Sequence, residues 1–135
     1  MNGSRSLGVT AAIGLVIQIA LGLLLARLGA PFPPLVIGVH MAIGVTGVAL
    51  VAFLLGRAYY SSSNAVKLLY ILAFVLVLAQ LALGFRILTV SDDQLAMSHE
   101  GIAVVILVLL AVTTVVDARQ KRAMTAPTGT PAPQP

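Results

Sequence analysis

Residues 14–47 read GLVIQIALGLLLARLGAPFPPLVIGVHMAIGVTG, two apolar runs separated by a short proline-rich segment. Proline has no amide hydrogen and cannot continue a helix, so Pro31, Pro33 and Pro34 predict a turn between two helices. A helix needs about 20 apolar residues to cross a bilayer core of about 30 Å. Both runs reach that length with their flanking residues, so this stretch predicts a hairpin of two membrane-spanning helices.

Four such runs cover most of the chain, at residues 7–26, 35–55, 68–88 and 97–116. They are continuous rather than alternating, which excludes the strands of a membrane β-barrel. The connections between the runs are short, and short connections place consecutive helices antiparallel. They are expected at residues 27–34, 56–67 and 89–94. We therefore expect an all-α, integral membrane four-helix bundle with up-down topology.

The whole bundle is expected to form one domain, residues 1–124, because a chain of 135 residues is short enough for a single domain. Residues 125–135 contain mainly Pro, Thr, Ala and Gly, and this composition predicts a disordered tail.

The composition agrees with a membrane protein and excludes several other classes. Of the 135 residues, 59% are hydrophobic and 9% are charged, against about 45–50% and about 25% in soluble domains. Too few polar side chains remain to cover a water-soluble surface. The chain has no cysteine, which excludes disulfides and thiolate metal sites. The net charge of +4 comes from bases scattered beside apolar runs, so it does not indicate a nucleic-acid partner.

The lysines and arginines predict the orientation in the membrane. Six of them belong to the end of the bundle that holds both termini, and two belong to the opposite end. The six are Arg5, Arg57, Lys67, Arg119, Lys121 and Arg122. Because basic residues accumulate on the cytoplasmic side, we expect both termini in the cytoplasm and the protein in a plasma membrane.

An internal repeat relates the two halves of the chain. Residues 18–22 read QIALG and residues 80–84 read QLALG, 62 residues apart. Each copy is followed by an arginine, Arg27 or Arg86, and then by a histidine at the mouth of the next helix. The pattern predicts that the bundle is a duplicated helical hairpin.

The two histidines of the chain, His40 and His99, occupy equivalent positions in the repeat. They are expected at nearly the same depth, on helices that lie diagonally across an up-down bundle. Two imidazoles that face each other at one height can hold haem iron from both sides. The simpler alternative is that each histidine only meets interfacial water at a helix mouth.

Other residues offer alternative ligands near the histidines. Met41 and Met97 stand beside the histidines in the sequence, so a His–Met pair is a second arrangement. A non-haem metal site is a third, and it would use His99 with Asp92, Asp93 and Glu100. This third set lacks the spacing typical of a metal site.

Three further pairs are candidate haem-binding residues. Arg27 and Arg86 can bind the two propionates, or can simply reach the membrane interface. Gln18 and Gln80 can bond to an imidazole or line the cofactor pocket, or can join helices by hydrogen bonds. Gly22 and Gly84 lie one turn from the glutamines and can make room for a porphyrin edge, or for close helix contact.

The pattern resembles one four-helix half of the heme A synthase / cytochrome oxidase assembly family. The resemblance is carried by the Gln-x-x-Leu-Gly motif, the short proline-containing outer loop and the histidine at the start of the next helix. These features occur in residues 14–47, and residues 74–104 repeat their logic. The resemblance implies that His40 and His99 are axial haem ligands and that the activity is haem modification or oxidase assembly.

Three features depart from that family. The chain contains one half only, Ile37 stands where full-length members place an acidic residue, and the loop cysteines of many members are missing. Oxidation of a haem methyl group, the chemistry of that family, is therefore not assured, and whether the chain is an enzyme stays open.

The sequence leaves three functions open. The first is a haem protein, with haem b favoured over haem o or a, that acts in haem modification, oxidase assembly or electron transfer, alone or as a homo-oligomer. The second is a respiratory b-type cytochrome that exchanges electrons with quinol or another redox protein. The third is a cofactor-free accessory subunit or small transporter. No residue pattern supports a nucleophilic enzyme, because cysteine is absent and no serine pairs with a histidine at depth.

Overall fold

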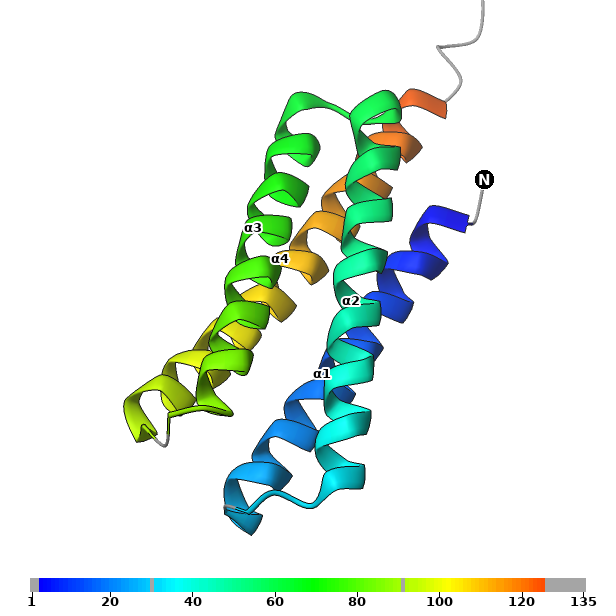
Figure 1. Cartoon of the computed structure of the whole chain (residues 1–135). Coiled ribbons are helices and arrows are strands. Elements are labelled where there is room, and N and C mark those ends of the chain that lie inside the picture. Colours follow the sequence, from blue (N-terminus) through cyan, green and yellow to red (C-terminus); the bar gives the residue numbers. More distant parts are fainter. Residues whose placement is uncertain (1–2, 30, 91, 126–135) are drawn as a thin grey trace, which may run out of the picture.

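The computed structural model describes residues 3–29, 31–90 and 92–125 and shows four long helices. They are α1 (Gly3–Leu28), α2 (Pro34–Ser61), α3 (Asn64–Ile87) and α4 (Asp93–Thr125). All four are long and apolar enough to cross a membrane. Consecutive helices run antiparallel, and the first and last described residues lie at the same end of the bundle (Figure 1). The protein is thus a four-helix membrane bundle, as the sequence predicted.

Local sequence explains where the helices end. Gly29 has φ +68°, and its amide bonds back to the carbonyl of Leu25, which is the left-handed turn that favours glycine after a helix. Pro34 then stands in the first turn of α2, where its missing amide hydrogen costs nothing. The carboxylate of Asp92 accepts hydrogen bonds from the amides of Gln94 and Leu95 and so caps the start of α4.

Two boundaries differ from the sequence prediction. The predicted connection at residues 56–67 shrinks to Ser62 and Ser63, because α2 continues to Ser61 and α3 begins at Asn64. The hydroxyl of Ser63 accepts a hydrogen bond from the amide of Val66, which starts α3 earlier than hydropathy alone indicates. Thr125 ends α4 instead of starting a tail, and the rest of the predicted tail lies outside the described residues.

Each helix contacts two others: α1 and α3 each pack against both α2 and α4. In the described residues the diagonal pairs α1–α3 and α2–α4 share no backbone contact, which is the arrangement of a square bundle. Figure 1 shows the bundle as two hairpins side by side, α1–α2 and α3–α4.

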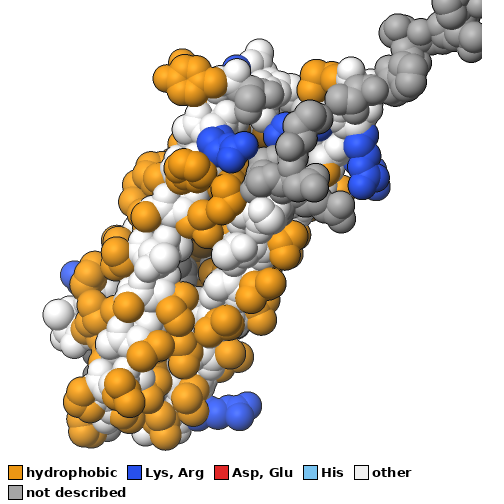
Figure 2. Space-filling view, turned by 90° about the vertical axis from the view of Figure 1, so that its right-hand side faces the viewer, with side chains coloured by type: hydrophobic (Ala, Val, Ile, Leu, Met, Phe, Trp, Pro, Cys, Tyr) orange, Lys and Arg blue, Asp and Glu red, His pale blue; other side chains and the backbone are white. Residues whose placement is uncertain are grey.

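The packed core occupies the half of the bundle near the termini. Its buried residues come from all four helices: Ala11, Val51, Leu54, Ala58, Val66, Tyr70, Ala73, Ile106 and Leu110. Large apolar side chains such as Leu35 and Leu68 are exposed on the outside, as in a bundle surrounded by lipid. Apolar side chains also dominate the long face in Figure 2, and Lys and Arg gather at the end where the termini lie. The other half of the bundle is less filled and holds the candidate site.

Candidate functional site

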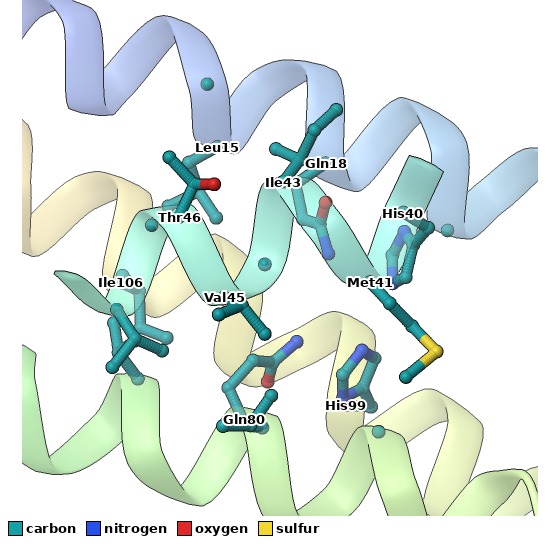
Figure 3. Close-up of a pocket in the computed structure, with 18 of the residues that line it drawn as sticks. Leu15, Gln18, His40, Met41, Ile43, Val45, Thr46, Gln80, His99 and Ile106 are labelled. Carbon is teal, nitrogen blue, oxygen red and sulfur yellow. The ribbon is translucent and has the colours of Figure 1, made fainter. Parts of the chain in front are cut away.

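The two histidines meet in the centre of the bundle, between the hairpins. His40 comes from α2 and His99 from the diagonal helix α4, and their ring centroids lie 6.3 Å apart with the planes inclined by 51°. Figure 3 shows both rings pointing into the same space. Their predicted common depth is therefore confirmed by direct proximity.

A glycine on the preceding helix supports each histidine. A Cβ atom placed on Gly22 would lie 3.5 Å from Cε1 of His40, and one placed on Gly84 would lie 3.2 Å from Cε1 of His99. Each imidazole therefore rests on a helix surface that has no side chain at that point. Gly22 and Gly84 were predicted to make room for a ligand edge, but in this structure the room is used by the histidines themselves.

A second polar layer, formed by Gln18 and Gln80, lies closer to the termini. Gln18 stands four residues before Gly22, and Gln80 stands four residues before Gly84, which places this layer about 6 Å from the histidine layer. A Cβ atom on Gly44 would lie 3.0 Å from Nε2 of Gln18. The side-chain amide of Gln18 therefore packs against α2 at a position where α2 has no side chain. Both amides point into the space between the hairpins (Figure 3).

Four buried polar atoms of these two layers have no hydrogen-bond partner. They are Nδ1 of His40, Nδ1 of His99, Oε1 of Gln18 and Oε1 of Gln80. A buried polar group without a partner costs about 1–3 kcal/mol, so native proteins rarely leave one unexplained. Here the four atoms come from the two equivalent halves of the repeat and belong to residues around one cavity, which points to a ligand site.

The cavity between the layers has a volume of about 310 Å³ and is lined by all four helices. It reaches Phe32, Ile37 and Ala96 at the end with the α1–α2 and α3–α4 loops. His40, His99, Gln18 and Gln80 contribute most of its polar groups, together with Glu100. From there the cavity continues along α1 and α2 as far as Thr10 and Val51.

The arginines do not join the cavity. Arg27 and Arg86 are both exposed and neither belongs to the cavity lining. Arg86 follows Gly84 by two residues, a turn of about 200°, so it leaves the opposite side of α3. Arg27 follows Gln18 by nine residues and Arg86 follows Gln80 by six, so the two arginines are not equivalent in the repeat. Their binding of propionates stays a prediction that these contacts do not support.

The alternative metal ligands lie in different surroundings. Met41 lines the cavity, whereas Met97 is 73% exposed, so only Met41 is near enough to compete with a histidine. Asp92 and Asp93 are exposed at the start of α4, and the described residues contain no group of three His, Asp or Glu that could hold a metal ion. The alternative of a non-haem metal site at His99 therefore has no support among the described residues, since Asp92 caps the start of α4 and Asp93 is exposed beside it.

A polar cluster around Asp117 was not predicted from the sequence. Asp117 is buried at the terminal end of α4 and accepts hydrogen bonds from Ser62 and from Lys121. Tyr70 of α3 lies beside the same carboxylate. The cluster joins the α2–α3 connection to α4. Its sequence signal was the spacing of Asp117 and Lys121, which places opposite charges one helical turn apart.

Comparison with family models, with curated proteins and with solved structures finds no match to this chain. Its function must therefore be inferred from the geometry.

The geometry fits a metal between the two histidines. Metal–imidazole bonds are about 2.0–2.1 Å long, which sets the centroids of two rings on opposite sides of one metal about 6 Å apart. The observed separation is 6.3 Å. Two side-chain nitrogens are too few to hold a bare ion, which needs four or more ligands. The donor set therefore fits a metal that brings its own equatorial ligands, as haem does.

Proposed function

We propose that this protein is a membrane haem protein in which His40 and His99 are the two axial ligands. The observation that carries the proposal is the pair of facing imidazoles, one from each repeated hairpin, with ring centroids 6.3 Å apart in a membrane bundle. His40 and His99 would hold the group in the space between the hairpins.

The surrounding residues would hold and shield the group. Gly22 and Gly84 set the position of each imidazole against its neighbouring helix. The glutamines lie about 6 Å deeper and would stand below the group that the histidines hold. The apolar wall of the cavity excludes water, and a low local dielectric strengthens the contacts inside it. Haem bound in this way supplies a one-electron redox centre.

Within this class, a role in haem modification, oxidase assembly or electron transfer is favoured. The resemblance of the repeated motif to the heme A synthase family supports haem modification, with haem o or a as alternatives to haem b. Two axial histidines leave no open position on the iron, which favours electron transfer instead. A b-type cytochrome served by quinol is the second candidate, and the buried Oε1 atoms of Gln18 and Gln80, which have no hydrogen-bond donor, favour it.

The charge distribution supports a location in the plasma membrane with both termini in the cytoplasm. Arg57, Lys67, Arg119, Lys121 and Arg122 all belong to the end of the bundle near the termini. The histidine layer would then lie towards the outer face of the membrane. Reporter fusions or selective labelling of residues in the α2–α3 connection test this orientation directly.

The decisive experiment is an absorption spectrum of the protein purified in detergent from cells supplied with iron, oxidised and then reduced with dithionite. We expect a low-spin, six-coordinate spectrum and one haem per chain, with the haem type read from the pyridine haemochrome. A protein that is colourless and does not take up added haemin would contradict the proposal. That result would favour a cofactor-free accessory subunit or small transporter.

A further inference from the structure

The cavity does not end at the glutamines but continues towards the termini, between α1, α2 and the side chains of Ile106 and Leu110 of α4. This continuation, which we call the apolar extension, is lined by Thr10, Gly14 and Leu15 of α1 and by Gly47, Val48 and Val51 of α2. Thr10 lies eight residues before Gln18, so the extension reaches about 12 Å beyond the glutamine layer.

The extension exists because the two hairpins differ at this depth. Aligning Gln18 with Gln80 and His40 with His99 makes Leu76 the counterpart of Gly14, and Ile106 the counterpart of Gly47. A Cβ atom on either glycine would meet nothing within 4 Å, whereas Ile106 is fully buried in the packed core. Ile106 of α4 therefore forms part of the wall of the extension, and the space beside Gly14 and Gly47 of the first hairpin stays open.

The walls of the extension offer almost no hydrogen bonds. Thr46 is the polar residue of α2 closest to Gly47, and its hydroxyl already donates to the carbonyl of Ala42. An apolar cavity of this kind stays dry and favours hydrocarbon. At its mouth, by contrast, Oε1 of Gln18 and Oε1 of Gln80 are buried acceptors without a donor. The occupant therefore has a hydrogen-bonding head and an apolar chain.

The head must also be neutral, flat and a donor. No lysine or arginine lines the cavity, so a phosphate or carboxylate head would be buried without a counter-charge. The ring centroids of His40 and His99 lie 6.3 Å apart, so the space between the hairpins next to the glutamine layer is narrow. A planar ring that carries hydroxyl groups fits this narrow space and offers protons to the glutamine oxygens.

We propose that the glutamine layer and the apolar extension together bind an isoprenoid hydroquinone dissolved in the bilayer. Its hydroxyl groups donate to Oε1 of Gln18 and of Gln80, its ring lies in the narrow space below the histidine layer, and the first part of its chain fills the extension. The site uses neither histidine as a ligand for this molecule. The proposal rests on the second candidate function, a protein served by quinol, and identifies the residues that would bind the quinol.

The test is equilibrium binding of a synthetic hydroquinone with a decyl chain to the full-length protein in detergent. Gly14→Leu and Gly47→Ile give the first hairpin the side chains that the second already has, and each should weaken binding at least tenfold. Gly56→Leu is the matched control, because Gly56 is exposed and lies outside the cavity lining. It should bind as the unmodified protein does.

Two further variants test the head group. Gln18→Met and Gln80→Met keep the length of the side chain and remove the acceptor, and each should weaken binding about tenfold. Decanol should compete poorly, because it has the chain without the ring. Equal competition by decanol, by a phospholipid or by a prenylated haem would overturn the hydroquinone assignment, as would unchanged binding to both glycine variants.

The same assay separates this proposal from the haem proposal. His40→Ala and His99→Ala should lose haem and keep hydroquinone binding within about threefold. Loss of both ligands in the histidine variants, with folding intact by circular dichroism, would overturn the separate hydroquinone site. Loss of hydroquinone binding in the glycine variants alone would support it, whatever their haem content.

Discussion

At the level of the histidines the two hairpins are nearly identical, whereas near the termini they have little in common. In both hairpins a glycine of the first helix supports a histidine of the second, and a glutamine lies one turn away. Near the termini, Gly8 of α1 corresponds to Tyr70 of α3, and Ala58 of α2 corresponds to Asp117 of α4. A ligand shared by two equivalent half-sites requires matching residues, but the rest of the bundle does not.

The difference shows that two hairpins with the same repeated motif can be packed differently near the termini. In the second hairpin the terminal end is filled and polar, because Tyr70, Thr113 and Asp117 are all buried there. In the first hairpin, Gly8 lets Thr114 of α4 approach α1 closely, and the open space lies nearer the glutamines, beside Gly14 and Gly47. The second hairpin therefore supplies more of the packed core, and the first supplies the extra cavity.

The largest effect is expected at the histidines and tests the equivalence of the hairpins. His40→Ala and His99→Ala should each abolish stoichiometric haem binding, because one remaining imidazole cannot complete six-coordination. The two variants should lose haem to the same extent, measured by pyridine haemochrome per chain. Full haem content in either one, with an unchanged spectrum, would show that this hairpin does not supply a ligand.

The next largest effect is a loss of stability on substitution of Asp117, which lies where the hairpins differ most. Asp117→Ala removes the carboxylate that pairs with Lys121 and accepts the hydrogen bond of the Ser62 hydroxyl. The free energy of unfolding should fall by about 1–3 kcal/mol, measured by titration with SDS. Asp93→Ala removes an exposed carboxylate and should cost less than about 0.5 kcal/mol. Equal losses in the two variants would mean that the buried cluster does not stabilise the fold.

A smaller effect on haem binding is expected from substitution of Gly22 or Gly84, and its size should differ between the two half-sites. A Cβ atom on Gly84 would be 3.2 Å from His99, which forces the ring to move, whereas one on Gly22 would be at an ordinary 3.5 Å from His40. Gly84→Ala should weaken haem binding about fivefold, and Gly22→Ala less than about twofold. Haem dissociation rates measure the difference, and the reverse order would contradict this account of the histidine positions.

The smallest effect is expected from the exposed arginines. Arg27→Ala combined with Arg86→Ala should raise the rate of haem loss less than about threefold, because neither side chain lines the cavity and exposed ion pairs contribute about 0–1 kcal/mol. Transfer of haem to apomyoglobin measures this rate. An increase above about tenfold would restore the predicted propionate contacts and would mean that the arginines turn inward when haem binds.

Much of the site was predictable because the repeat marks equivalent positions. The spacing of QIALG, QLALG, His40 and His99 was enough to place both histidines at one depth and both glutamines at a common depth of their own. The role of Gly22 and Gly84 was not predictable in the same way, because a glycine near a polar residue can serve a ligand, a histidine or a neighbouring helix. Their contacts with the imidazole rings depend on helix rotation, which hydropathy does not fix.

Length, hydropathy and the prolines by themselves determined four membrane helices and their antiparallel order, since each follows from the local sequence and from bilayer thickness. Only the tertiary structure decided that the ring centroids of the histidines lie 6.3 Å apart, that the arginines stay outside, and that the cavity continues beyond the glutamines towards the termini. Apolar runs specify that a helix spans the membrane, but the side chains of neighbouring helices fix its rotation and the space left between them.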